Sequence, residues 1–219
     1  MPETGRQTDV IHARKCQDFT LSGDLQHFKT AGDPAAEIDR CWDGSPAGAL
    51  ASVVYCLWSE KALYFGFSCP FTELSMDTGT PGEQPRWALW DLDIAEILIS
   101  PMAQPVDHYY EFEVAPSGHW LDLEVVFCDG RPFYRWEQRF HEMVRSKIDL
   151  DRRIWTAELK IAVAGLSRPT AKPGDEWSLN LLRADGPAEA RRYLALWPTL
   201  TPEPDFHVPS RFGRMRLVE

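Results

Sequence analysis

Residues 109–127, YYEFEVAPSGHWLDLEVVF, hold the pattern that decides the fold. In 109–115 the side chains alternate between two faces, with Tyr110, Phe112 and Val114 on one and Tyr109, Glu111 and Glu113 on the other. A period of two is typical of a β-strand with one buried face. The turn-forming sequence PSG at 116–118 leads into a second strand over 119–127. We therefore predict an antiparallel hairpin whose two glutamates face outward.

Short strand patterns recur along the rest of the chain. They cover 50–58, 62–68, 93–100, 144–148, 154–161, 176–184, 192–197 and 212–218. Helical signals are few, namely a short helix at 133–142 and a single turn at 162–166. About ten strands joined by turns predict an all-β fold, an antiparallel, jelly-roll-like β-sandwich with little helix.

The chain shows no internal repeat and no linker. Residues 1–15 are polar and are predicted to form a loose N-terminal arm, and 16–219 are predicted to form a single domain. The hydrophobic fraction of 44% and the charged fraction of 26% exclude a disordered, collagenous or coiled-coil protein.

Charge and targeting signals limit the partners. The 219 residues carry a formal net charge of −10, which disfavours nucleic acid because the phosphate backbone would be repelled. The longest uncharged run, 44–59, is too short and too interrupted to span a bilayer, so no membrane partner is expected. The polar N-terminus has no signal-like apolar region, and we expect a cytoplasmic location. The five cysteines are an odd number without CxxC spacing, and we expect reduced thiols packed in the core.

Common cofactor and catalytic motifs are missing from the sequence. It contains no GxGxxG, GxxxxGK[ST] or GxSxG, and the His141-Glu142 pair fails as HExxH because residue 145 is arginine. Its histidines and cysteines do not show metal-ligand spacing. Dinucleotide, P-loop, serine-hydrolase and zinc chemistry are therefore unsupported, and no cofactor is predicted.

Polar side chains on neighbouring strands give a candidate site. Glu96 and Glu111 lie on the polar faces of their strands, and Asn180, the only asparagine, lies in the middle of a strand, where asparagine is disfavoured. Trp90 precedes the first of these strands, and Trp197 ends another. Sugar hydroxyls need polar partners and the C–H face of a sugar ring packs on aromatic rings, so we predict a sugar site with tryptophan walls and a polar floor. The alternative is a solvated outer face of carboxylates, with the tryptophans in the core.

Several stretches carry a family resemblance over about residues 35–218. They are ALYFGF (62–67), WDLDIAE (90–96), YYEFEVAPSG (109–118), WTAELKI (155–161) and the segments 177–183, 197–199 and 206–213. In these stretches the sequence resembles the carbohydrate-binding modules of family 9, and more closely the family 9-like (DOMON-like) branch. Leu92 splits a pair of acids found in the family motif, and Ala162 stands where proline is usual.

The resemblance implies a β-sandwich that binds sugars in carbohydrate catabolism, often the chain ends of glucans or xylans, with glycoside hydrolases as partners. It places the sugar between Trp90 and Trp197, hydrogen-bonded to Glu96, with further polar positions near Asn180 and Arg183. Members have arginine where this chain has Glu111, which inverts the local charge. Structural calcium also occurs in the family, although its ligands do not map onto this chain.

The predicted function is non-catalytic carbohydrate binding, and no catalytic residue is assigned. One alternative is a glycoside hydrolase with paired carboxylates. Glu111 and Glu113 would lie roughly 6.6 Å apart along a strand, near the lower limit of about 6.5–9.5 Å for inverting enzymes, but every such pair meets this spacing. The other alternative is an interaction or cofactor-binding module, since a fold does not fix a function. A deep cleft with a carboxylate of raised pKa would favour the enzyme, and a shallow groove with an aromatic rim would favour binding.

Overall fold

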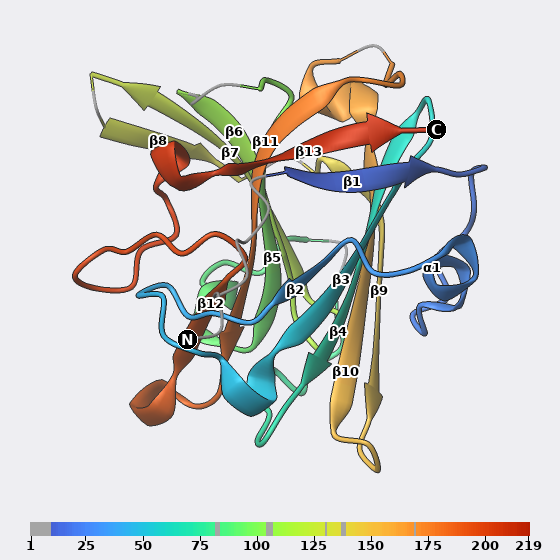
Figure 1. Ribbon diagram of the computed structural model, residues 1–219. Coiled ribbons are helices and arrows are strands. Elements are labelled where there is room, and N and C mark those ends of the chain that lie inside the picture. The colour runs from blue at the N-terminus through green and yellow to red at the C-terminus, as the bar shows by residue number, and fades with distance from the viewer. Residues whose placement is uncertain (1–9, 82–83, 104–106, 130, 137–138, 169) are drawn as a thin grey trace, which may run out of the picture.

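The computed structural model describes residues 10–81, 84–103, 107–129, 131–136, 139–168 and 170–219. In these residues thirteen strands pair into one sheet (Figure 1). The strands are β1 (Val10–Lys15), β2 (Ala36–Ile38), β3 (Ser52–Trp58), β4 (Ala62–Pro70), β5 (Ile94–Ser100), β6 (His108–Val114), β7 (Trp120–Cys128), β8 (Arg131–Arg135), β9 (His141–Asp149), β10 (Ile154–Ala162), β11 (Glu176–Asp185), β12 (Arg192–Ala195) and β13 (Gly213–Val218). The helical segments are α1 (Gln26–Ala31) and the 3₁₀ turns η1 (Gly48–Leu50), η2 (Leu89–Asp91), η3 (Val163–Leu166), η4 (Ala188–Ala190) and η5 (Pro209–Arg211). The predicted all-β class with little helix is confirmed.

The sheet curls so that its two halves face each other. The strand order is β8-β7-β6-β5-β11-β13-β1-β3-β4-β10-β9, with β12 added to β11 and β2 added to β3. In Figure 1, strands β5, β6, β7 and β11 form a first wall and strands β3, β4, β9 and β10 a second wall, while β13 and β1 run across one end of the molecule. The predicted sandwich is thus confirmed, with one refinement: β1 is parallel to both of its neighbours, β13 and β3.

The space between the two walls is filled by one large apolar core. Ile97 and Phe112 from the first wall pack in the same cluster as Phe65 and Trp155 from the second wall. All four side chains are fully buried. They occupy alternate positions on their strands, as a period-two pattern requires.

The outer face of the first wall is also covered. A second apolar cluster on this face includes Leu98, Tyr109, Leu123 and Leu182, and the loop residue Phe206 packs against it. The outward-facing residues of β5 and β6 therefore lie beneath loops rather than in water. This corrects the expectation that Glu96 and Glu111 lie on an open polar face, because both are nearly fully buried.

Two local predictions are wrong. Residues 10–15, expected in a loose arm, form β1 because Ile11 and Ala13 are buried between β13 and β3; residues 1–9 lie outside the described part. The described parts of 133–142, residues 133–136 and 139–142, do not form the predicted helix, since they contribute to the strands β8 and β9, and β8 pairs along the edge of β7. No helix in the described ranges is long and apolar enough to cross a membrane.

The cysteines fit the predicted core only in part. Cys41, Cys56 and Cys69 are buried, Cys16 is half-buried and Cys128 is exposed, and all five are free thiols. Burial raises the pKa of Cys69 to about 11, so this thiol stays protonated at neutral pH.

Candidate functional site

A cavity of about 330 Å³ opens on the outer side of the first wall. It is lined by Trp87, Trp90, Glu111, Leu123, Tyr134 and His207. We call it the Trp90 cavity. Its residues come from the loop before β5, from β6, β7 and β8, and from the loop before β13, so segments far apart in sequence build it.

One side of the Trp90 cavity is an exposed group of tryptophans. Trp87 is 48% exposed and Trp90, in η2, is 36% exposed. Their ring centroids are 4.9 Å apart and nearly perpendicular, and the ring of Trp136 lies 5.2 Å from that of Trp87. Large aromatic rings left in water at a concave site are typical of a binding surface.

The loop that carries Trp87 and Trp90 is held at both of its ends. The Arg86 guanidinium donates from Nε to Asp77 Oδ2 at 2.9 Å, and the backbone N–H of Arg86 donates to the Trp120 carbonyl at 2.9 Å. After the loop, Arg191 donates to the Leu92 carbonyl at 2.7 Å. These contacts fix the loop without any ligand, which reduces the entropy lost on binding.

The opposite side of the cavity is formed by Tyr134 and His207. The two rings meet edge to face, with centroids 5.7 Å apart. His207 is held by Tyr109, whose hydroxyl lies 2.7 Å from Nδ1. Burial, together with the charge of Glu111, raises the pKa of Tyr109, so the hydroxyl keeps its proton and can donate it to Nδ1.

Glu111 lies at the inner end of the Trp90 cavity. Its side chain is almost fully buried, and no described residue forms a hydrogen bond with Oε2. The nearest basic atom is His207 Nε2, 3.7 Å from Oε2. Burial raises the pKa of Glu111, and His207 opposes part of this shift.

Two further glutamates lie behind Glu111. Glu96 on β5 is directly opposite Glu113 on β6, and neither lines the cavity. Burial raises the pKa of both well above the ordinary value, and the charge of Glu111 raises each pKa further. Three carboxyl groups therefore share one apolar face, and they favour the neutral form because water does not reach them.

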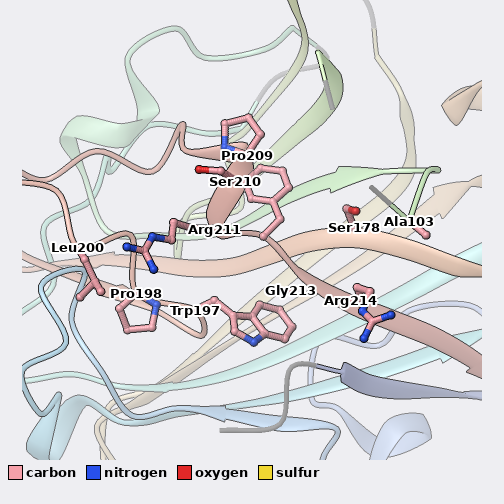
Figure 2. A pocket seen from close by; sticks show the side chains of 11 residues that line it. Ala103, Ser178, Trp197, Pro198, Leu200, Pro209, Ser210, Arg211, Gly213 and Arg214 are labelled. Atoms are coloured by element: carbon pink, nitrogen blue, oxygen red, sulfur yellow. The ribbon is translucent and has the colours of Figure 1, made fainter. Parts of the chain in front are cut away.

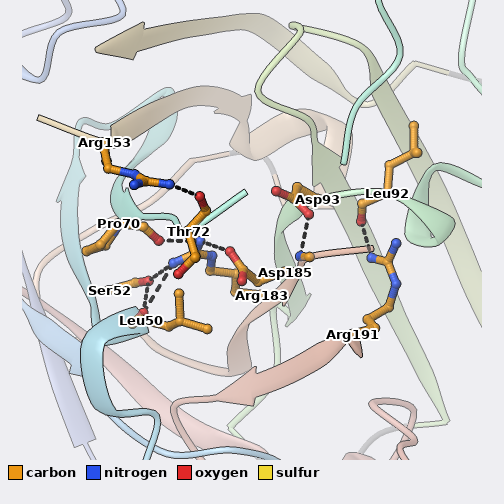
Figure 3. A network of polar contacts seen from close by, with 11 residues as sticks. Leu50, Ser52, Pro70, Thr72, Leu92, Asp93, Arg153, Arg183, Asp185 and Arg191 are labelled. Carbon is orange, nitrogen blue, oxygen red and sulfur yellow. Dashed lines mark hydrogen bonds and ion pairs between the residues drawn. The ribbon is translucent and has the colours of Figure 1, made fainter. Parts of the chain in front are cut away.

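Asn180 and Arg183 lie outside this cavity and serve the fold. The Asn180 amide is fully buried and pairs with the backbone of Trp197, donating to its carbonyl at 2.8 Å and accepting from its N–H at 3.1 Å. Arg183 is also fully buried; it donates to Ser52 Oγ at 2.8 Å and pairs with Asp185 (Figure 3). The predicted floor positions of both residues are corrected, because neither lines the Trp90 cavity.

Trp197 is not the partner of Trp90. Its indole is only 8% exposed and belongs to the interior core, where it lies against Gly213 so closely that a Cβ there would overlap the ring. The exposed edge of Trp197 lines a different cavity of about 530 Å³ with Arg211 and Arg214 (Figure 2). The two cavities share no lining residue. The predicted clamp of Trp90 and Trp197 is therefore absent, and Tyr134 and His207 stand opposite the tryptophan group.

The calcium implied by the resemblance finds no set of ligands. Within the described ranges, no three or more His, Cys, Asp or Glu side chains are grouped so that they could hold a metal ion.

The lining residues that the sequence did not predict as site residues are Trp87, Leu123, Tyr134 and His207. Trp87 lies close before Trp90 in the sequence, and this proximity could have placed it in the same site. Tyr134 was not predicted as a site residue because the sequence predicted a helix over 133–142. His207 reaches the cavity because the loop before β13 crosses the outer face of the first wall.

The sequence itself matches no known family model. No curated protein matches it either. Solved structures do match. A candidate carbohydrate-binding protein from Bacteroides uniformis is 15% identical, with a TM-score of 0.73 over 95% of this chain and 98% of the other chain.

Two structures of a carbohydrate-binding module of family 9 from Caldicellulosiruptor kristjanssonii also match over 95% of this chain. The complex with glucose is 14% identical at a TM-score of 0.61 and is covered over 95% of its length. The complex with cellotriose is 15% identical at a TM-score of 0.60 and is covered over 93%. The protein thus has the fold of the family 9 carbohydrate-binding modules, as the sequence resemblance predicted.

Proposed function

We propose that the protein binds a carbohydrate in the Trp90 cavity and does not transform it. The observation that carries this proposal is the juxtaposition of exposed tryptophan rings with a buried, unpaired carboxyl oxygen of Glu111 in one concave site. The cavity volume of about 330 Å³ falls in the range of small-ligand sites.

The chemistry of the lining suits a sugar ring. A ring can stack its C–H face on Trp90 or Trp87, and its hydroxyls can donate to Glu111 and accept from the Nε2–H of His207 at the inner end. Two structural neighbours support this, because the family 9 modules were solved with glucose and with cellotriose. The sugar would lie between the tryptophan group and the Tyr134–His207 pair.

A glycoside hydrolase is the second candidate, since raised pKa values of buried carboxyl groups are also a feature of active sites. Glycosidic cleavage by this route needs two carboxyl groups flanking one bond. Among the carboxyl groups of the described residues, only that of Glu111 lines the Trp90 cavity, while Glu96 and Glu113 are buried behind it. The arrangement therefore favours binding. Turnover of aryl-glycosides by the parent protein that disappears in Glu111→Gln would establish the enzyme instead.

Calorimetric titration with glucose, cellobiose and cellotriose tests the proposal. We expect binding by the parent protein, and a loss of affinity of roughly tenfold in Trp90→Ala, because one stacked aromatic ring contributes on the order of 1 kcal/mol or more. The matched control is Arg211→Ala, which alters the cavity beside Trp197. Its affinity should equal that of the parent.

Three results would contradict the proposal. These are no binding of any sugar, unchanged affinity in Trp90→Ala, and a loss of affinity confined to Arg211→Ala, which would move the site to the other cavity. Thermal melting of each variant separates weaker binding from unfolding.

A further inference from the structure

The Trp90 cavity contains an acceptor without a donor. Glu111 is 2% exposed and lines the cavity, yet its Oε2 has no hydrogen-bond partner among the described residues. A buried carboxyl oxygen without a donor costs free energy in the folded protein. A ligand group that donates to Oε2 would remove this cost, so the cavity is complementary to a donor at its inner end.

The groups around this oxygen favour one kind of donor. Glu113, adjacent on the same face of β6, also has an unpaired Oε2, and Glu96 lies opposite Glu113 across the strand pair. His207 is the one basic residue among the described lining residues, which include no lysine or arginine. Glu96 and Glu113 favour the neutral form, so Glu111, whose Oε2 lies 3.7 Å from His207 Nε2, is the acid that can pair with a cation in the cavity. A cation beside a carboxyl group favours its ionised form, and the resulting hydrogen bond is charge-assisted, so an ammonium group would gain more here than a neutral hydroxyl.

The aromatic rings that line the cavity suit the same ligand. A cation is attracted to the faces of tryptophan and tyrosine rings within about 6 Å of their centroids. Trp87, Trp90 and Tyr134 surround the approach to Glu111 with such rings. A sugar that carries an ammonium group would use the rings both for stacking and for cation–π attraction.

We propose that the Trp90 cavity selects an amino sugar with a free, positively charged amino group, which pairs with Glu111. This inference rests on the proposed function and names its substrate class.

Three β-1,4-linked trisaccharides that differ at carbon 2 provide the test. They are the glucosamine trimer with an ammonium group, the N-acetylglucosamine trimer with an acetamide, and cellotriose with a hydroxyl. Calorimetric titrations at pH 6 and physiological salt should give at least tenfold tighter binding of the glucosamine trimer than of the other two. In Glu111→Gln the three affinities should fall within about threefold of each other, since one charge-assisted contact is lost.

Glu37→Gln is the matched control for general attraction of a cation to an acidic protein. Glu37 is exposed on β2, outside the lining of the cavity, and this variant removes the same charge. It should keep the parent's preference for the glucosamine trimer. Choline, a cation without a sugar ring, should bind at least tenfold more weakly than the trimer.

The remaining outcomes overturn the inference in distinguishable ways. Equal or tighter binding of cellotriose by the parent overturns amino-sugar selection and leaves carbohydrate binding in place. Absence of binding by all three trisaccharides overturns both. A preference for the glucosamine trimer that persists in Glu111→Gln overturns the contact assigned to Glu111. Binding of choline as tight as that of the glucosamine trimer shows that the cavity recognises the cation alone, and overturns the requirement for a sugar ring. The comparison of ligands on the parent protein is decisive even if Glu111→Gln does not fold.

Discussion

At the scale of single residues, hydrogen-bond satisfaction separates polar side chains that build the fold from those that can meet a ligand. Asn180 and Glu111 look alike in the sequence, because each is a polar residue within a largely apolar strand. In the structure the Asn180 amide is paired with the backbone of Trp197, whereas Glu111 Oε2 is unpaired and lines a cavity. A single sequence cannot distinguish them, since the distinction depends on which distant segment covers each residue.

Substitution of Asn180 should affect stability rather than binding. Asn180→Ala leaves the buried N–H and carbonyl groups of Trp197 without their partners, which should lower the free energy of unfolding by roughly 1–3 kcal/mol. Urea unfolding measures this loss. The dissociation constant for a sugar in the Trp90 cavity should stay within about twofold of the parent's. Trp90→Ala should show the reverse pattern, and a variant pair that loses binding and stability together would contradict the division of roles.

At the scale of elements, the sequence predicts best where the chain alternates over a long strand. β5, β6 and β7 follow their period-two pattern and were placed correctly. β8 was read as part of a helix because its aromatic and charged residues are exposed and leave no buried face to define a period. β1 was read as an arm because its VIHARK sequence buries only Ile11 and Ala13.

The site was harder to predict than the fold. Trp90 and Glu111 were assigned to it from the sequence, and both line the cavity. Tyr134 and His207 come from an edge strand and from a loop that crosses the outer face of the first wall, and no local pattern records such a crossing. The resemblance predicted Trp197 as the second tryptophan beside the sugar. Packing against Gly213 in the core holds the Trp197 indole away from the cavity.

The strand β1 should prove essential to the fold, although its polar sequence predicts a loose arm. It joins β13 to β3 and so links the two walls of the sheet. Ala13→Asp places a carboxylate in the interior core, where Ala13 is fully buried, and should cost several kcal/mol of stability. His12→Asp, on the exposed side of the same strand, should change stability by less than about 0.5 kcal/mol. Equal melting temperatures for the two variants would show that β1 does not belong to the sheet.

At the scale of the whole molecule, the proposed binding site and the apolar core lie in different layers. The interior core lies between the two walls, while the Trp90 cavity lies on the outer side of the first wall. Its aromatic residues Trp87, Trp90 and Tyr134 are exposed, so they can change without opening the interior. The buried acids beneath the cavity lower the stability of the folded protein, because burial disfavours their charged forms.

Those acids should control how stability depends on pH. Burial raises the pKa of Asp93 from its ordinary value near 3.8 to about 6, and raises the pKa values of Glu96, Glu111 and Glu113. Between the ordinary and raised values the folded state binds more protons than the unfolded state, so stability falls as pH rises through this window. The free energy of unfolding should therefore be lower at pH 7.5 than at pH 4.5. Carboxylates whose pKa is lowered, such as Asp18 beside Ser59, act in the opposite direction but only at more acidic pH.

Asp93→Asn isolates one part of this dependence. Asp93 Oδ1 accepts from the Gly186 N–H at 2.7 Å, a bond that an asparagine oxygen can keep, while the charge disappears (Figure 3). The variant should recover on the order of 2–3 kcal/mol at pH 7.5, since one pKa unit corresponds to about 1.4 kcal/mol, and it should gain little at pH 4.5. Denaturant unfolding at both pH values measures the difference, with the exposed Asp151→Asn as the control that should follow the parent. If the parent instead became more stable from pH 4.5 to 7.5, the buried acids would have to be ionised and fully paired in the folded protein, and the unpaired oxygen on which the ligand assignment depends would not exist.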